Sequence, residues 1–187
     1  MTETADLAAT PRLASQQRTV RAGILLGTAL FLAIGGAVYA LAPLPVLTGA
    51  GERLAYALRF APISALMLLL GVGVVGNTRF ATPAIDPLAG AERGRMLVYG
   101  RYLTNTLEQL VSHLCATLGF AALGGVFALR MIPALTACFV VGRLLFLFGY
   151  LSHPLRRAPG FTMTVQPTLF ALLYLVGRGV LDVVLGA

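Results

Sequence analysis

The chain has 187 residues, of which 58% are hydrophobic and 11% are charged, and its mean hydropathy is +0.85. This is too little charge to cover the surface of a soluble domain, so the composition predicts an integral membrane protein. The net charge of +7 comes from 14 arginines and no lysine. These arginines are spread through short polar segments and form no basic patch with interleaved aromatic residues, which argues against nucleic-acid binding.

Five apolar segments are long enough to cross a bilayer, since a spanning helix takes about 20 mostly apolar residues. We expect a polar, disordered segment at residues 1–22, an extra transmembrane helix at 23–43 and a four-helix membrane domain at 54–187. The spans of that domain are expected at residues 54–76, 97–127, 131–151 and 165–185. The predicted fold class is therefore an all-α, integral membrane helical bundle.

The first apolar segment has an alternative interpretation, a cleaved signal peptide. Its apolar run is long for a signal core, however, and the small residues "ALA" are followed by Pro43, which is a poor cleavage context. We therefore expect a retained helix.

The distribution of arginines predicts the orientation of the spans. Eight arginines fall in the three regions that five spans would place on one side, and only Arg53 and Arg130 fall on the other. By the positive-inside rule, the amino terminus and both longer loops should face the cytoplasm. The eight are Arg12, Arg18, Arg21, Arg79, Arg93, Arg95, Arg156 and Arg157.

Cysteine and histidine are too few and too scattered to build a metal site or a disulfide framework. Cys115 and Cys138 both fall in apolar segments, and His113 and His153 are isolated from each other. We therefore expect no bound metal.

The third span carries a line of polar residues. At about 100° per residue, Arg101, Asn105, Glu108 and Ser112 fall on one helix face, and Cys115 extends the line by a turn. A charge that faces lipid costs about 2.5–3.5 kcal/mol. This face must therefore contact protein, water or a polar ligand.

Two interpretations of this line remain open. In the structural one, Glu108 pairs with Arg101 or Arg143, and Asn105 bridges two helices. In the functional one, the face lines a pocket for a charged small molecule, where guanidinium groups hold carboxylates and Glu108 holds an amine.

The fourth span supplies a second set of candidates. Arg143, Phe146 and Tyr150 lie on one face of that helix, and Arg156 and Arg157 follow just past its end. An arginine well inside an apolar helix is too deep to reach the membrane surface. The arginines beside Tyr150 favour a functional role for this tyrosine.

Other charged residues in the spans have simpler explanations. Arg59 lies near the outer end of the second span and can extend to the membrane surface. Arg178 and Asp182 are four residues apart and should pair near the outer end of the last span.

The stretch "RYLTNTLEQ", with Arg101, Asn105 and Glu108, resembles the Arg-x-x-x-Asn-x-x-Glu signature of the MAPEG family, the membrane-associated proteins in eicosanoid and glutathione metabolism. The stretch "GRLLFLFGYLSHPLRRAPG" resembles the next helix of that family, with its arginine, Gly-Tyr pair and basic loop. "RFATPAIDPLAGAERGR" is similar to the cytoplasmic loop before the signature. The resemblance covers residues 54–187, as four helices in order.

This resemblance implies a homotrimer of four-helix protomers, a remote bacterial member of the family in the inner membrane. Glutathione would bind between neighbouring subunits near the cytoplasmic side. Arg157 matches the arginine that stabilises the glutathione thiolate, and Arg156 is adjacent and could take that role. The residues that would contact glutathione by matching position are Arg101, Asn105, Glu108, Arg143 and Tyr150, with Arg79 where the first family helix meets its loop.

The sequence also departs from the family pattern. Phe146 stands where the leukotriene-forming branch has a tyrosine, and Gln109 follows Glu108 where a tyrosine is common. Both changes remove hydroxyl contacts and argue against leukotriene or prostaglandin specificity. The span at 23–43 is not part of the basic family fold.

We therefore expect a membrane-bound glutathione-dependent transferase or peroxidase, which activates a thiolate for attack on a hydrophobic electrophile that arrives through the lipid bilayer. The alternative is a non-catalytic membrane protein whose polar line binds a lipid or stabilises an oligomer. A small transporter ranks below both, because the chain has no evident repeat pair with broken helices.

Overall fold

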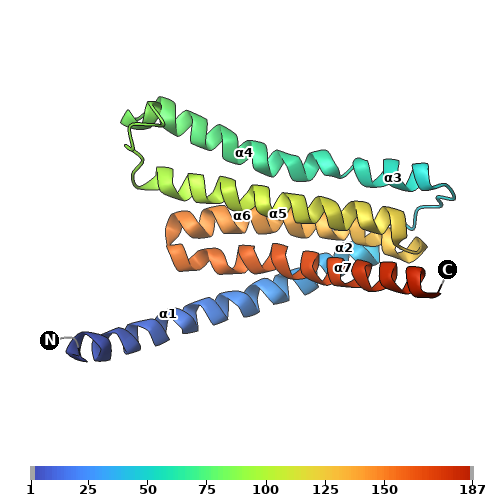
Figure 1. Ribbon diagram of the computed structural model, residues 1–187, viewed down its shortest axis with the longest axis horizontal. Helices are drawn as coiled ribbons and strands as arrows, with labels where there is room; N and C mark the ends of the chain where they lie inside the picture. Colours follow the sequence, from blue (N-terminus) through green and yellow to red (C-terminus); the bar gives the residue numbers. More distant parts are fainter. Residues whose placement is uncertain (1–2, 186–187) are drawn as a thin grey trace.

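The computed structural model describes the backbone of residues 3–185 and the side chains of residues 12–185, and all of its regular elements are helical (Figure 1). This confirms the all-α helical bundle expected from composition. The long helices are α1 (Glu3–Leu30), α4 (Ala61–Phe80), α5 (Arg95–Leu123), α6 (Met131–Ser152) and α7 (Ala158–Leu185). The shorter elements are η1 (Phe31–Gly35), α2 (Gly36–Leu41), α3 (Ala50–Leu58), η2 (Pro83–Ile85), η3 (Val126–Arg130) and η4 (Pro154–Arg157).

Within the described part of the chain, four helical stretches are long and apolar enough to cross a membrane. They are Arg12–Leu41, Ala50–Phe80, Val126–Ser152 and Pro154–Leu185. The third expected span corresponds to α5, which has 29 residues but is less apolar because it carries Glu108, Gln109 and His113. Despite this lower hydropathy, α5 runs along the bundle beside α4 and α6 (Figure 1).

Two boundaries differ from the sequence prediction. The polar composition of residues 1–22 predicts a disordered segment, whereas α1 begins at Glu3 and continues without a break into the apolar span. Alanine, leucine, glutamine and arginine dominate this segment, and their high helix propensity lets the helix extend outward. The last span begins at Ala158 and not at residue 165, because the chain turns back directly after η4.

Helices α4, α5, α6 and α7 run up and down in chain order, and α1 packs along the outer side of α7 (Figure 1). Small residues make these approaches close. A Cβ added to Gly142 of α6 would lie 2.5 Å from Thr164 Cγ2, and one added to Gly27 of α1 would lie 2.5 Å from the Pro159 carbonyl oxygen. Glycine therefore allows both α6 and α1 to pack tightly against α7.

Interhelical hydrogen bonds hold α4 against α5. The Tyr102 hydroxyl donates to the Met67 carbonyl at 3.0 Å, and Ser64 Oγ lies 2.9 Å from His113 Nε2. At the far end, Arg53 donates to the Gly124 carbonyl and so satisfies the carboxyl end of α5. These contacts fix one face of α5 and leave another face free.

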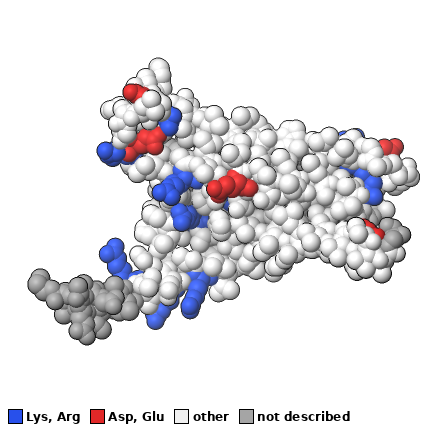
Figure 2. Space-filling model, in the orientation of Figure 1, with Lys and Arg blue, Asp and Glu red and all other residues white. Residues whose placement is uncertain are grey.

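Basic side chains gather at the end of the bundle that carries the α4–α5 and α6–α7 connections (Figure 2). This is the grouping on which the orientation prediction depends. At the other end, Arg178 forms the expected ion pair with Asp182 at 3.2 Å.

Candidate functional site

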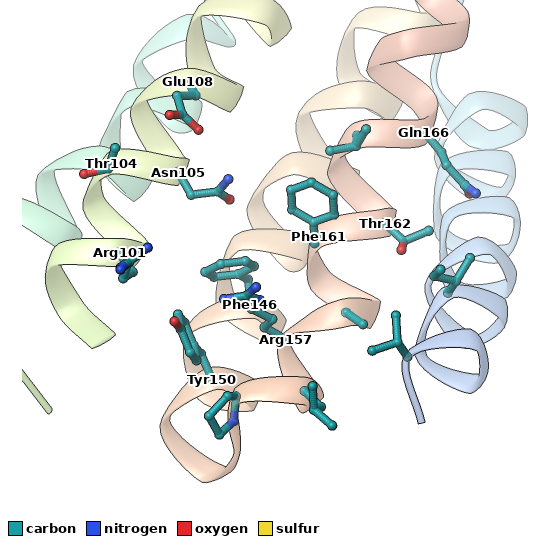
Figure 3. A pocket seen from close by; sticks show the side chains of 16 residues that line it. Arg101, Thr104, Asn105, Glu108, Phe146, Tyr150, Arg157, Phe161, Thr162 and Gln166 are labelled. Carbon is teal, nitrogen blue, oxygen red and sulfur yellow. The ribbon is translucent and has the colours of Figure 1, made fainter. Parts of the chain in front are cut away.

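A cavity of about 570 Å³ opens near the arginine-rich end of the bundle. Helix α5 forms one wall, α1 forms the opposite wall, and α6, η4 and α7 lie between them (Figure 3). Its volume is typical of a small-molecule site. The lining residues are Val20, Ile24, Arg101, Thr104, Asn105, Glu108, Phe146, Tyr150, Pro154, Leu155, Arg157, Ala158, Phe161, Thr162, Val165 and Gln166.

The wall formed by α5 carries the first three residues of the polar line predicted from the sequence, whereas Ser112 and Cys115 do not line the cavity. Arg101, Asn105 and Glu108 all face the cavity, with Thr104 beside them (Figure 3). Arg101 and Glu108 are exposed, and neither forms an ion pair with another described residue. Glu108 is therefore not neutralised by Arg101 or Arg143, as the structural interpretation would require.

Arg143 lies beneath the cavity and is fully buried, at 0% exposure. Its Nη1 donates to Asn105 Oδ1 at 2.8 Å, its Nη2 donates to Thr164 Oγ1, and its guanidinium lies 4.9 Å from the centre of the Phe146 ring. Asn105 thus bridges α5 and α6, as the structural interpretation anticipated. Arg143 does not line the cavity but holds the Asn105 side chain that does.

Tyr150 and Arg157 form the end of the cavity nearest the loops. His153 leaves α6 with extended backbone angles, its Nδ1 accepts from the Leu155 amide at 3.2 Å, and Pro154 starts the η4 turn. This turn brings Arg157 back over the last turn of α6, where its guanidinium lies 4.8 Å from the centre of the Tyr150 ring. The stacking orients the guanidinium while its charge stays exposed.

Two predicted site residues lie elsewhere. Arg79 forms an ion pair with Glu92 at 2.6 Å beside the α4–α5 connection. Arg156 lines a second, smaller cavity of about 350 Å³ between α1 and α6. The structure therefore brings together five of the eight candidate residues, with Arg143 directly beneath them.

Several cavity residues were not predicted from the sequence. Thr162 and Gln166 come from α7, and Val20 and Ile24 come from α1. The threonine and glutamine are four residues apart in an apolar helix, so their shared face was a usable signal. Val20 and Ile24 carried no signal, because Val20 falls in the segment expected to be disordered and an apolar residue in a span, such as Ile24, is expected to face lipid.

The chemistry of the lining is that of a binding site for a charged molecule. It offers two guanidinium groups, one carboxylate, a phenol, two side-chain amides and the hydroxyls of Thr104 and Thr162, but no cysteine, histidine, serine or lysine. No group of three or more metal-ligating side chains occurs among the described residues. The lining thus holds no thiol, and no histidine or lysine that could activate its hydroxyl groups as nucleophiles.

Comparison with known proteins agrees with this arrangement. The model of the MAPEG family matches residues 54–177, which is more than half of the chain and includes the helices that carry Arg101, Arg143 and Arg157. Neither a curated protein nor a solved structure matches the chain. The four apolar helices and this match make the chain an integral membrane protein, and it belongs to the MAPEG family.

Proposed function

We propose that the chain is a glutathione-dependent transferase or peroxidase of the membrane, and that the cavity between α5 and α1 binds glutathione. Family membership supports a glutathione-related activity of this type. The observation that carries the proposal is that Arg101, Glu108 and Arg157 share one open cavity without neutralising one another.

Glutathione fits the charges of this cavity. It carries two carboxylates and one ammonium, and the cavity presents two guanidinium groups and one carboxylate. Arg101 can hold a carboxylate through charge-assisted hydrogen bonds and Glu108 can hold the ammonium, which leaves Arg157 for the anionic sulfur. Asn105, with its oxygen engaged by Arg143, has its amide nitrogen left to donate to the peptide carbonyls of the ligand.

Arg157 is the residue best suited to activate the thiol. A free thiol has a pKa near about 8.5, and a guanidinium beside it favours the thiolate, which is the nucleophile. The thiolate sulfur then forms a bond to an electrophilic carbon of a hydrophobic substrate. The electron pair of the broken bond leaves with the departing group, or moves within the substrate and is protonated.

The proposed orientation places the cavity end of the bundle in the cytoplasm, following the arginine distribution. This is the compartment that supplies glutathione, whereas the hydrophobic electrophile reaches the cavity through the bilayer. We also propose the homotrimer implied by the family, in which a neighbouring subunit would complete the open side of the cavity.

Isothermal titration of glutathione into the detergent-purified protein tests this proposal. We expect binding by the parent chain, and a loss of affinity of about tenfold or more in Arg101→Ala and in Glu108→Gln. Arg59→Ala is the matched control, because Arg59 is exposed but lies outside the cavity. A parent chain that does not bind glutathione would contradict the proposal.

Native mass measurement of the same variants separates the alternative interpretation. If the polar line only stabilises an oligomer, Arg101→Ala and Glu108→Gln dissociate the subunits. If it binds glutathione, the oligomer of each variant has the same number of subunits as the parent.

A further inference from the structure

The second cavity, of about 350 Å³, lies on another face of α1 than the cavity proposed to bind glutathione. Its walls are apolar: Leu26 and Leu30 come from α1, and Leu145 and Phe148 come from α6. Helix α1 precedes the family-matched segment, which begins at residue 54. This cavity is therefore a feature of the present chain that the matched helices alone do not form.

Two glycines shape the second cavity. A Cβ added to Gly149 would collide with the Arg156 carbonyl oxygen, and one added to Gly23 would lie 3.1 Å from Pro159 Cδ. The glycines thus bring η4 against the end of α6 and bring α1 against the start of α7. Because both residues line the cavity, their missing side chains also leave room between α1 and α6.

The charge around the second cavity is positive only. Arg156 is the one charged residue in its lining among the described residues, and its exposed guanidinium makes no hydrogen bond or ion pair with another of them. Residues 12–30 of α1 carry three further arginines and no acidic residue, and residues 145–160 also contain no aspartate or glutamate. A ligand with a negative charge finds a partner here, whereas an ammonium group finds none.

The length of the cavity matches one leaflet of a bilayer. Along α1 its lining runs from Thr19 to Leu30, which is 11 residues or about 16 Å of helix. Half of a hydrocarbon core of about 30 Å is about 15 Å. Arg156 belongs to η4, at the arginine-rich end of the bundle, so the cavity has a cationic mouth at the membrane surface and an apolar interior.

We propose that this cavity binds one phospholipid with an anionic headgroup. The phosphate pairs with Arg156, and one acyl chain packs between α1 and α6 against Leu26, Leu145 and Phe148. Basic pockets between membrane helices suit anionic lipid headgroups, and the apolar walls exclude a ligand that is polar throughout. The proposal goes beyond the activity proposed above and does not depend on it, because Arg156 and Arg157 line different cavities.

Tryptophan fluorescence tests the site directly. The sequence contains no tryptophan, so Phe148→Trp places a single fluorophore in the cavity wall. The full chain is reconstituted in phosphatidylcholine vesicles that contain a minor fraction of either phosphatidylglycerol or phosphatidylcholine with brominated acyl chains, which quench tryptophan on contact. We expect an apparent affinity about fivefold higher for the anionic lipid. Equal quenching by the two lipids would overturn the proposal.

Phe170→Trp is the matched control for the reporter. Phe170 is also exposed but lines neither cavity, so both brominated lipids should quench this variant equally. Leu145→Trp replaces Phe148→Trp if the latter does not fold, because Leu145 belongs to the same wall. Quenching by both lipids that is much weaker at the cavity than at position 170 would mean that protein covers the cavity, and would contradict the proposal.

Two arginine variants test the headgroup contact. Arg156→Ala, added to the reporter, should remove the preference for phosphatidylglycerol and leave quenching by phosphatidylcholine unchanged. Arg157→Ala removes the same charge at the adjacent position but lines the other cavity, so the preference should remain. A preference that survives Arg156→Ala would show that the membrane surface charge attracts the lipid without a site.

Glycerol phosphate separates a lipid site from a site for a soluble phosphate compound. It carries the anionic group of the headgroup without acyl chains, so an excess of it should leave the quenching of Phe148→Trp by phosphatidylglycerol unchanged. Loss of the preference in its presence would assign Arg156 to a soluble anion and overturn the lipid proposal.

Discussion

The sealed contact around Arg143 and the open cavity beside it place the same residue type in opposite situations. Arg143 is fully buried, and its terminal nitrogens bond to Asn105 and Thr164. Arg101 and Arg157, which line the adjacent cavity, remain exposed and have no carboxylate partner among the described residues. An arginine in these helices is therefore structural when neighbouring helices supply acceptors for it, and available to a ligand when they do not.

The largest expected effect is on stability, and it should come from removing a hydrogen-bond acceptor of Arg143. In Asn105→Leu, Nη1 of a fully buried cation loses its partner, and we expect a loss of about 3 kcal/mol in the free energy of unfolding. Denaturation of the detergent-solubilised chain by SDS measures it. The double variant Asn105→Leu with Arg143→Met should recover most of the loss, because the buried charge is then gone.

Thr104→Leu is the matched control for that prediction. Thr104 lines the same wall but makes no hydrogen bond to the described residues, so its replacement should change stability by less than about 0.5 kcal/mol. Equal stability of the Asn105→Leu variant and its parent would show that the Arg143 contact is not the structural element described above.

Removing the exposed charge of Arg157 should have a smaller effect, which acts mainly on the pKa of the bound thiol and little on the stability of the protein. In Arg157→Ala the bound glutathione thiol should have a pKa about one unit higher than in the parent, because the cation that favours the thiolate is gone. Titration of thiolate absorbance in the ultraviolet measures the midpoint, which should move to higher pH. The unfolding midpoint should change little, because Arg157 is exposed and its contact with the Tyr150 ring contributes about 0.5–1 kcal/mol.

Arg156→Ala is the control for this change. Arg156 is adjacent in sequence but lines the second cavity, so the thiol midpoint should match that of the parent chain. A shift in Arg156→Ala with none in Arg157→Ala would transfer the thiolate role to Arg156.

Much of the architecture could be predicted because it depends on local pattern. Hydropathy predicted the four apolar helical stretches of the described residues, although two boundaries differ, and the helical spacing of Arg101, Asn105 and Glu108 predicted a shared face, which the structure places along one cavity. The burial and hydrogen bonding of Arg143 could not be predicted, since its partners lie 38 and 21 residues away along the chain. Which arginine is sealed depends on how three helices pack, and no single helix encodes this.

The α1 wall was missed for a related reason. In sequence, Val20 belongs to a segment expected to be disordered and Ile24 looks like a lipid-facing residue, and the close fit of Gly23 and Gly27 against α7 brings both to the cavity. The polar pair Thr162 and Gln166 was visible as a shared face, but a lone threonine and glutamine in a span more often form interhelical hydrogen bonds. Part of Gln166 does so with Thr28.

The smallest effect is expected at the far end of the bundle, where Arg178 pairs with Asp182 within one helix. The side chains are 47% and 27% exposed, and a solvent-accessible pair four residues apart contributes little, so Arg178→Ala should cost under about 1 kcal/mol. Glutathione affinity should be unchanged, as measured by the same titration. A loss of several kcal/mol would mean that an exposed arginine can be as structural as Arg143, and burial would then no longer separate the two situations.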